Sequence, residues 1–312
     1  MIRVFLAISL LVISSLGCQH NDKELANGFQ PMPESSDTPD SKRIVAASYA
    51  LQFLTQEIVG DTYMVEFPMQ SSDDPKSWTP SVKEILSIQK ATALIVNGPN
   101  AKYANWIDLT TLPAKILCNS CDMIDAQDLL TISDYQITHQ HGPEGEHSHP
   151  YQVPYTWLDP VLAEKQAKKI CSFLVQKFPS EANLFETNFQ NLKEKLRRIS
   201  RQYDSQGDSS QRFIISSNPH AKYLTRRLGV TDLHLLVFDA ISDDPAAEDK
   251  MNRWIESNSP KQFVYFDSTD PKLVEWAAQN GLTAIQLDLL DKAPDEGDFL
   301  TTLESNLKKL AD

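Results

Sequence analysis

Short apolar runs alternate with amphipathic segments from residue 43 to the end of the chain. In the first half, the pattern predicts strands and helices in turn, over residues 44–48, 51–59, 63–67, 81–89 and 93–97. In the second half, it predicts strands over residues 213–216, 234–238, 263–266 and 284–287, with helices over 221–228, 248–257, 272–279 and 299–310. Such alternation favours parallel sheets flanked by helices. We therefore expect an α/β protein with two similar lobes.

Two helices are predicted between these halves. Asp159-Pro160 opens the first, which runs to about residue 177, because proline is favoured at a helix start. The second, over residues 180–203, has one apolar stripe whose positions are spaced by three and four residues. The stripe consists of Phe185, Phe189, Leu192, Leu196, Ile199 and Tyr203. We expect a rigid connector over residues 179–206, between an N-terminal lobe over 43–178 and a C-terminal lobe over 207–312.

The first 17 residues have the pattern of an export signal. Arg3 precedes an apolar run over residues 4–16, which is shorter than a membrane-spanning helix needs. The ending Ser-Leu-Gly-Cys resembles a bacterial lipobox, so Cys18 is the expected lipidation site. The alternative is an ordinary secretory signal with a chance cysteine. Residues 18–42 are polar and rich in proline, which is typical of a flexible tether.

The acidic composition limits the kinds of partner that this protein can bind. The chain has 312 residues, with 29 Lys+Arg against 42 Asp+Glu, a formal net charge of −13. This acidity repels phosphate backbones and excludes nucleic-acid binding through a basic surface, but it tolerates cations. We find no Gly-rich phosphate loop, G-x-S-x-G elbow or H-E-x-x-H pair, so we do not expect an enzyme.

Four of the seven histidines lie within eleven residues, in a polar segment over 132–156 that we expect to be a loop. They are His139, His141, His147 and His149. Histidines that alternate with acids can hold Zn²⁺, Cu²⁺ or Ni²⁺ weakly. The alternative is a solvated polar loop without selected affinity. The clustering favours metal contact.

Cys118 and Cys121 form a single CxxC pair. In an exported protein they can close a local disulfide loop, which we rank before free thiols and before redox activity. A lone pair is weak evidence for zinc, because a structural zinc site of this type needs two further ligands.

Several motifs follow one another in a recognisable order. Residues 43–61 form the first strand and helix, and Asp-Pro-Lys-Ser-Trp-Thr-Pro-Ser at 74–81 is similar to D-P-H-x-x-x-P-[ST]. The histidine-rich segment precedes Tyr-Thr-Trp-Leu-Asp-Pro at 155–160. Ser-Asn-Pro-His-Ala-Lys-Tyr-Leu at 217–224 is similar to S-H-x-x-x-x-Y-[FL], and Asp267 follows a predicted strand. In this order the chain resembles the zinc- and manganese-binding receptors of bacterial ABC importers, the cluster A-I solute-binding proteins.

The resemblance covers residues 43–312 and implies two lobes, a rigid linking helix and a divalent cation captured between the lobes. It also implies delivery to an ABC permease and its ATPase by an exported lipoprotein, held at a bacterial membrane and expected to be monomeric. The alternative is a non-transporting lipoprotein that keeps the scaffold, has lost the metal site, and binds a partner or a non-metal ligand.

The positions that match the family's metal ligands are mostly substituted. They hold Lys76, Tyr155, Asn218 and Asp267, of which only Asp267 is a strong ligand for zinc. Three explanations are open. His220 can supply an imidazole in a shifted register, together with Asp267 and an acid at 73 or 74. Alternatively, Lys76 pairs with Asp267 in place of a metal, or the cleft takes a non-metal ligand.

Remaining polar and aromatic residues have structural interpretations. We expect Trp157 and Leu158 to pack beside the cleft, and Asp159 to cap the helix that follows it. Tyr223 is expected in the core at a lobe interface, and His234 at the edge of a strand.

Overall fold

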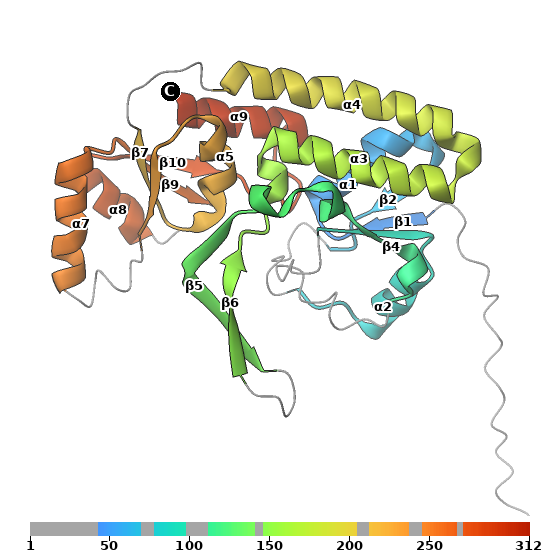
Figure 1. Ribbon diagram of the computed structural model, residues 1–312, viewed down its shortest axis with the longest axis horizontal. Helices are drawn as coiled ribbons and strands as arrows, with labels where there is room; N and C mark the ends of the chain where they lie inside the picture. Colours follow the sequence, from blue (N-terminus) through green and yellow to red (C-terminus); the bar gives the residue numbers. More distant parts are fainter. Residues whose placement is uncertain are drawn as a thin grey trace, which may run out of the picture. The chain divides into compact units, whose positions relative to one another are not determined.

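Two four-stranded parallel sheets carry the fold (Figure 1). The computed structural model describes residues 43–69, 78–97, 112–140, 146–204, 212–236, 245–266 and 271–312, and residues 38–312 form one unit by their contacts. The N-terminal sheet has the order β2-β1-β3-β4. Its strands are β1 (Arg43–Ala46), β2 (Met64–Glu66), β3 (Ala93–Val96) and β4 (Leu117–Asn119). The sequence pattern missed β4, which is only three residues long and buries only Cys118 fully.

The C-terminal sheet repeats this topology, with the order β10-β9-β7-β8. Its strands are β7 (Phe213–Ser216), β8 (Asp232–Leu235), β9 (Gln262–Phe266) and β10 (Thr283–Leu287). In each sheet the strand order reverses between the first and third strands of the lobe. In α/β folds, ligands bind outside the carboxyl ends of the strands at such a reversal. The predicted α/β class with two similar parallel sheets is confirmed.

The strand predicted over residues 234–238 lies earlier, at β8. Its register pairs Ile215 with His234 and Ser216 with Leu235, so the paired part of the strand begins at Asp232 and ends at Leu235. His234 is half-buried on this edge strand, where its ring stacks on Trp254 with centroids 4.4 Å apart. The structural role expected for His234 at a strand edge is confirmed.

Helices cover the sheets, and four of the described helices begin at a capping side chain. The N-terminal half contains α1 (Tyr49–Val59), α2 (Val82–Gln89), α3 (Pro160–Lys177) and α4 (Ala182–Tyr203). The C-terminal half contains α5 (Lys222–Arg227), α7 (Pro245–Asn258), α8 (Pro271–Gln279) and α9 (Phe299–Ala311). Ser48, Ser81, Asp159 and Asp298 accept the hydrogen bonds that start α1, α2, α3 and α9. Asp159 therefore has the capping role predicted for it.

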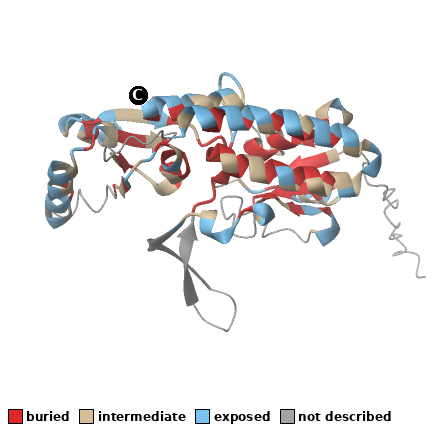
Figure 2. Cartoon of the chain, turned by 45° about the horizontal axis from the view of Figure 1, so that its top comes forward, coloured by how far each residue is buried: buried red, intermediate tan, exposed pale blue. Residues whose placement is uncertain are grey.

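The longest described helix, α4, lies over the N-terminal half (Figure 1) and packs against α1, α3 and the C-terminal helix α9. The apolar positions from Phe185 to Ile199 in its predicted stripe are buried, and Tyr203 at its end is half-buried. Figure 2 shows this buried face turned toward the sheets and an exposed face turned away from them. The helix thus packs against helices of both halves along a continuous apolar seam.

One hydrophobic cluster extends through both lobes. It contains Leu94 of the N-terminal sheet, Trp157, Leu192 of α4 and Val264 of the C-terminal sheet, all fully buried. A second, smaller cluster fills the opposite face of the C-terminal sheet, around Phe263. The lobes therefore share most of their apolar interior.

The segment expected as a polar loop forms a β-hairpin instead. Strands β5 (Thr131–Gln140) and β6 (Glu146–Gln152) pair in antiparallel fashion. The sequence interpretation gave weight to the polar residues and too little to Ile132, Tyr135, Ile137 and Tyr151, which favour strands. No helix within the described ranges has the length and hydrophobicity for a bilayer crossing. The export signal over residues 1–17 and Cys18 lie outside those ranges.

Candidate functional site

Tyr155 and His220 meet where the two lobes adjoin. Tyr155 follows β6 and begins the short helix η7 (Thr156–Leu158), whereas His220 lies in η9 (Pro219–Ala221) after β7. Their ring centroids are 4.4 Å apart. Tyr155 is 1% exposed and His220 is 8% exposed, so the two rings form a nearly dry contact across the lobe boundary.

Further aromatic rings surround this pair. Trp157 meets Tyr155 edge to face at 5.5 Å, and the Phe266 ring lies 6.1 Å from His220. Phe266 ends β9, next to β7, at the strand reversal of the C-terminal sheet. The predicted packing of Trp157 beside this site is confirmed, since its side chain is fully buried.

The Asn218 side chain has a capping role at the same place. Its Oδ1 accepts a hydrogen bond from the His220 backbone N–H at 3.0 Å, which begins η9. Ser216 Oγ in turn donates to the Asn218 carbonyl at 2.7 Å. The asparagine therefore orients His220, because its amide oxygen is engaged in starting the turn that carries the imidazole.

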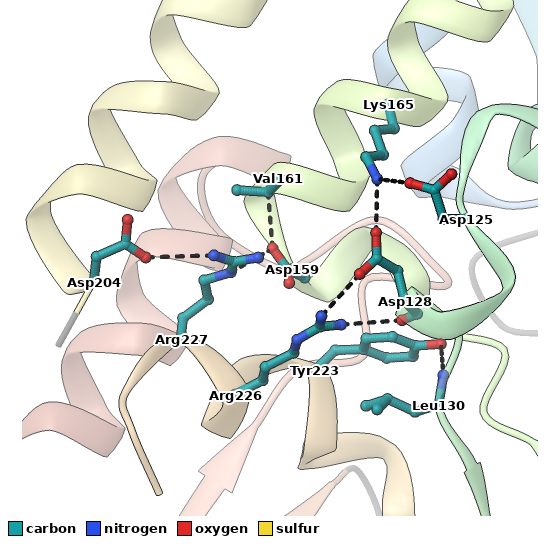
Figure 3. Close-up of polar contacts among 10 residues, drawn as sticks. All are labelled: Asp125, Asp128, Leu130, Asp159, Val161, Lys165, Asp204, Tyr223, Arg226 and Arg227. Atoms are coloured by element: carbon teal, nitrogen blue, oxygen red, sulfur yellow. Dashed lines mark hydrogen bonds and ion pairs between the residues drawn. The ribbon is translucent and has the colours of Figure 1, made fainter.

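Ion pairs join the lobes beside these rings (Figure 3). Arg227 Nε of α5 donates to Asp159 Oδ1 at 2.8 Å, and Arg227 Nη1 lies 3.5 Å from Asp204 at the end of α4. Asp159 is fully buried, and its Oδ1 also accepts the Val161 N–H that starts α3. Arg227 of the C-terminal lobe thus binds both the start of α3 and the end of α4.

A second ionic cluster centres on Asp128, at the end of η5 (Ala126–Asp128). Asp128 binds Lys165 Nζ of α3 at 2.7 Å and Arg226 Nη2 of α5 at 2.9 Å. Lys165 also binds Asp125 at 3.0 Å. The two cations hold the pKa of the Asp128 carboxyl below its usual value. This cluster again links both lobes, directly before strand β5.

Sequence reasoning missed a buried polar network that includes Thr156, the residue after Tyr155. Asn97 Oδ1, at the carboxyl end of β3, accepts hydrogen bonds from Thr156 Oγ1 at 3.1 Å and from Gln166 Nε2 at 2.6 Å. Asn97 Nδ2 donates to the Pro154 carbonyl, and Gln166 Nε2 also reaches Ser120 Oγ at 3.0 Å. No motif signals this network, because its members come from four separate segments.

The expected disulfide between Cys118 and Cys121 is wrong, since both are free thiols in the structure. Cys118 is buried within the N-terminal core. Cys121 Sγ joins the polar network by donating to the Asn97 carbonyl at 3.2 Å. Burial raises the pKa of Cys118 to about 12 and that of Cys121 to about 11. Both side chains are therefore protonated near neutral pH, in keeping with structural thiols rather than reactive ones.

The other predicted site residues are only partly visible. Lys76, His141 and Asp267 lie outside the described residues. In the hairpin, position 139 pairs with position 147, and position 149 pairs with Ile137. Paired positions share a face of an antiparallel ladder, and a strand returns to the same face every second residue. The register therefore groups His139, His147 and His149 on one face of the hairpin.

The described part of the site offers one imidazole, that of His220, between aromatic rings. Ion pairs that join the two lobes lie nearby. Within that part, no three His, Cys, Asp or Glu side chains lie close enough together to hold a metal ion. Residue 267, one of the predicted ligand positions, directly follows Phe266 in the chain.

Residues 44–312 match the family model described as zinc-uptake complex component A, periplasmic. The chain belongs to this family. It is 24% identical over 278 residues to the zinc-binding lipoprotein AdcA of Streptococcus pneumoniae, with 86% of this chain and 54% of that protein covered. It is 24% identical over 285 residues to the high-affinity zinc uptake system protein ZnuA of Bacillus subtilis, with 88% of each chain covered. The chain spans about half the length of AdcA, the first of these relatives.

The solved structure of the laminin-binding protein Lmb of Streptococcus agalactiae has the same fold. It superposes with a TM-score of 0.69 at 19% identity, over 86% of this chain and 98% of that one. The resemblance to metal-binding receptors drawn from the sequence motifs is therefore confirmed at the level of family and fold.

Proposed function

We propose that this chain is the extracytoplasmic solute-binding component of an ABC importer that takes up a divalent cation, with Zn²⁺ as the first candidate. The observation that carries the proposal is the family match over residues 44–312. The names of the streptococcal and Bacillus relatives support zinc. The partners are an ABC permease and its ATPase, and the lipobox-like sequence ending at Cys18 supports a lipid anchor.

The cation is the cargo, and we place its capture at the carboxyl ends of β7 and β9. His220 supplies the imidazole at the lobe boundary, and Asp267 supplies a carboxylate. This choice is supported by the 6.1 Å separation of the His220 and Phe266 rings, because residue 267 is the next in the chain. Tyr155 and Asn218 are not ligands in this proposal, because one packs on His220 and the other caps its turn.

The hairpin is the proposed collecting site, with histidines 139, 141, 147 and 149. The pairing of positions 139 and 147, with 149 on the same face, supports weak chelation. Neutral imidazoles bind Zn²⁺, Ni²⁺ and Cu²⁺ well, so such a face is able to gather cations before they enter the cleft.

Calorimetric titration of the full-length chain with ZnCl₂ tests the proposal. We expect binding with Kd well below about 1 mM. In the variant His139→Asn/His147→Asn, the weaker binding phase should be lost, because two imidazoles of one face are removed. Removal of residues 139–149 should have the same effect and leave the fold intact.

His234→Asn is the matched control, since His234 stacks on Trp254 in the C-terminal lobe and is not a proposed ligand. Its titration should match that of the unmodified chain. An unmodified chain that shows no binding tighter than about 1 mM contradicts the metal function. Unchanged weak binding in the double histidine variant contradicts the role of the hairpin.

A second candidate is a non-transporting lipoprotein on the same scaffold. It is favoured by the packing and capping roles of Tyr155 and Asn218, which occupy positions of family ligands without offering an imidazole. A gene locus that encodes neither a permease nor an ATPase, together with absent zinc binding, would support this candidate over the importer.

A further inference from the structure

Tyr223 of the C-terminal lobe takes part in the hydrogen-bond ladder of the hairpin at the end where its two strands join the rest of the fold. This end, formed by residues 130 and 153, is called the root of the hairpin. The Val153 N–H donates to the Leu130 carbonyl at 2.9 Å. The Leu130 N–H donates to Tyr223 Oη at 3.0 Å, and the Tyr223 hydroxyl donates to the Val153 carbonyl at 3.1 Å. The phenol therefore bridges the two strands where β5 begins and β6 has ended.

This arrangement departs from an ordinary antiparallel ladder. A hydrogen-bonded pair of residues normally exchanges two direct N–H···O=C bonds. Here Leu130 and Val153 share one direct bond, and the hydroxyl of Tyr223 takes the place of the second. A hydroxyl can do this because it donates one hydrogen bond and accepts another. Tyr223 is fully buried, and burial raises its pKa to about 12, so the donating proton is retained.

The same helix holds the root at a second point. Arg226, one turn after Tyr223 on α5, donates to the Asp128 carbonyl at 3.0 Å and to Asp128 Oδ1 at 2.9 Å. Asp128 lies two residues before Leu130. Figure 3 shows Tyr223 and Arg226 side by side, facing the segment that leads into β5. The hairpin is thus fastened to α5 by one buried neutral contact and one charged contact.

The same contacts also connect to the candidate site. His220 precedes Tyr223 by three residues, in the turn that continues into α5. Tyr155 follows Val153 by two residues and packs on the His220 ring at 4.4 Å. The hairpin root and the turn that carries His220 therefore touch twice, once through the Tyr223 hydroxyl and once through the Tyr155 ring.

We propose that Tyr223 is a positioning residue that fixes the histidine hairpin to the C-terminal lobe and couples cation binding on the hairpin to the turn that carries His220. The fixing of the hairpin stands on the hydrogen bonds alone. The coupling rests on the proposed function. The simpler alternative is a core tyrosine whose ring fills space and whose hydroxyl is only satisfied locally.

Hydrogen–deuterium exchange of the full-length chain without metal tests whether Tyr223 fixes the hairpin. In Tyr223→Phe, amides in residues 126–133 and 150–156 should exchange at least about tenfold faster, because the bridging hydroxyl is lost. Tyr63→Phe is the matched control, since Tyr63 is also buried but lies in the N-terminal lobe next to Phe178. Exchange at the root that stays unchanged in Tyr223→Phe overturns the fixing role.

Arg226→Met provides a second variant that leaves the buried phenol in place, should Tyr223→Phe fold poorly. The Arg226 side chain is 36% exposed, so its loss is expected to leave the core intact. It should speed exchange in residues 126–133 and leave 150–156 unchanged, because the hydrogen bonds of Arg226 go to Asp128 on the strand-entry side. Equal loosening of both segments would contradict the division of roles between Tyr223 and Arg226.

Hydrogen–deuterium exchange with added ZnCl₂ tests the coupling between the hairpin and the turn that carries His220. Zinc held by His220 would protect residues 217–224 directly, so the comparison is made in chains that also carry His220→Asn and Asp267→Asn. In that background, with Tyr223 intact or with Tyr63→Phe added, zinc should slow exchange by about threefold or more in both the hairpin and residues 217–224. With Tyr223→Phe added instead, zinc should bind the hairpin with the same affinity by calorimetry but no longer affect residues 217–224. A zinc effect on residues 217–224 that persists with Tyr223→Phe in this background overturns the coupling.

These experiments distinguish failure of the proposed metal function from failure of the coupling. Absence of zinc binding by calorimetry refutes the proposed metal function and the coupling, while the metal-free exchange still decides whether Tyr223 fixes the hairpin. In the background that carries His220→Asn and Asp267→Asn, zinc binding that protects the hairpin without altering residues 217–224 refutes only the coupling.

Discussion

The Asp159 carboxylate has both a local and a long-range role. Its Oδ1 starts α3 through the Val161 N–H and also binds Arg227 of the other lobe. The side chain is fully buried, and within the described part of the chain its Oδ2 has no hydrogen-bond partner. A buried carboxylate of this kind depends on its cation, because an unpaired charge in a dry interior is strongly unfavourable.

Arg227→Met should therefore lower the free energy of unfolding by about 3 kcal/mol, measured by urea denaturation. Asp159→Asn in the same chain should restore part of this loss, because asparagine keeps a capping oxygen and removes the charge. Arg226→Met is the matched control on the same helix. Its ion pair is more exposed, so its loss should cost less than about 1 kcal/mol. Equal losses in both variants, or strictly additive effects of Arg227→Met and Asp159→Asn, would contradict this account.

At the scale of elements, the strongest periodic patterns were predicted well. The stripe from Phe185 to Ile199 identified α4, because a long amphipathic helix repeats its signal over many turns. The Asp159-Pro160 pair located the start of α3 for a similarly local reason. Strand β4 was missed because three residues carry too little periodicity. The hairpin was missed because its polar side chains resembled those of a loop.

The candidate site was less predictable than the elements. Sequence motifs placed Tyr155 and Asn218 near the cleft but assigned them to ligand positions, whereas the structure gives them packing and capping roles. These roles depend on partners distant in sequence or on local turn geometry. The Asn97 network and the position of the Tyr223 hydroxyl depend on tertiary contacts, so no local pattern reports them.

Helix α4 offers a direct test of its buried seam. Leu192→Ala on α4 should reduce the free energy of unfolding by about 2–5 kcal/mol, because a fully buried side chain is replaced by a cavity. Leu184→Ala is the matched control on the same helix, since Leu184 is 43% exposed. Its effect should stay within about 1 kcal/mol. Urea denaturation followed by circular dichroism measures both. Similar losses at the two positions would mean that the seam does not stabilise the fold.

At the scale of the molecule, the shared interior makes the lobes interdependent. One apolar cluster contains core residues of both sheets and of α4. Trp157 Nε1 of the N-terminal half donates to the Leu289 carbonyl of the C-terminal half at 2.8 Å, and both residues are buried. Ionic contacts of Arg226 and Arg227 reinforce the same boundary. An arrangement of this kind resists independent motion of the lobes.

Unfolding should therefore be a single transition that involves both lobes. Circular dichroism and pulsed hydrogen exchange in urea should give the same midpoint for residues 43–178 and 212–312. Trp157→Phe should lower that common midpoint, with a loss of about 2 kcal/mol, because the Leu289 carbonyl loses its donor and the ring shrinks. Two separate midpoints in the unmodified chain would contradict the shared interior. A shift confined to one half in Trp157→Phe would show that this contact serves one lobe alone.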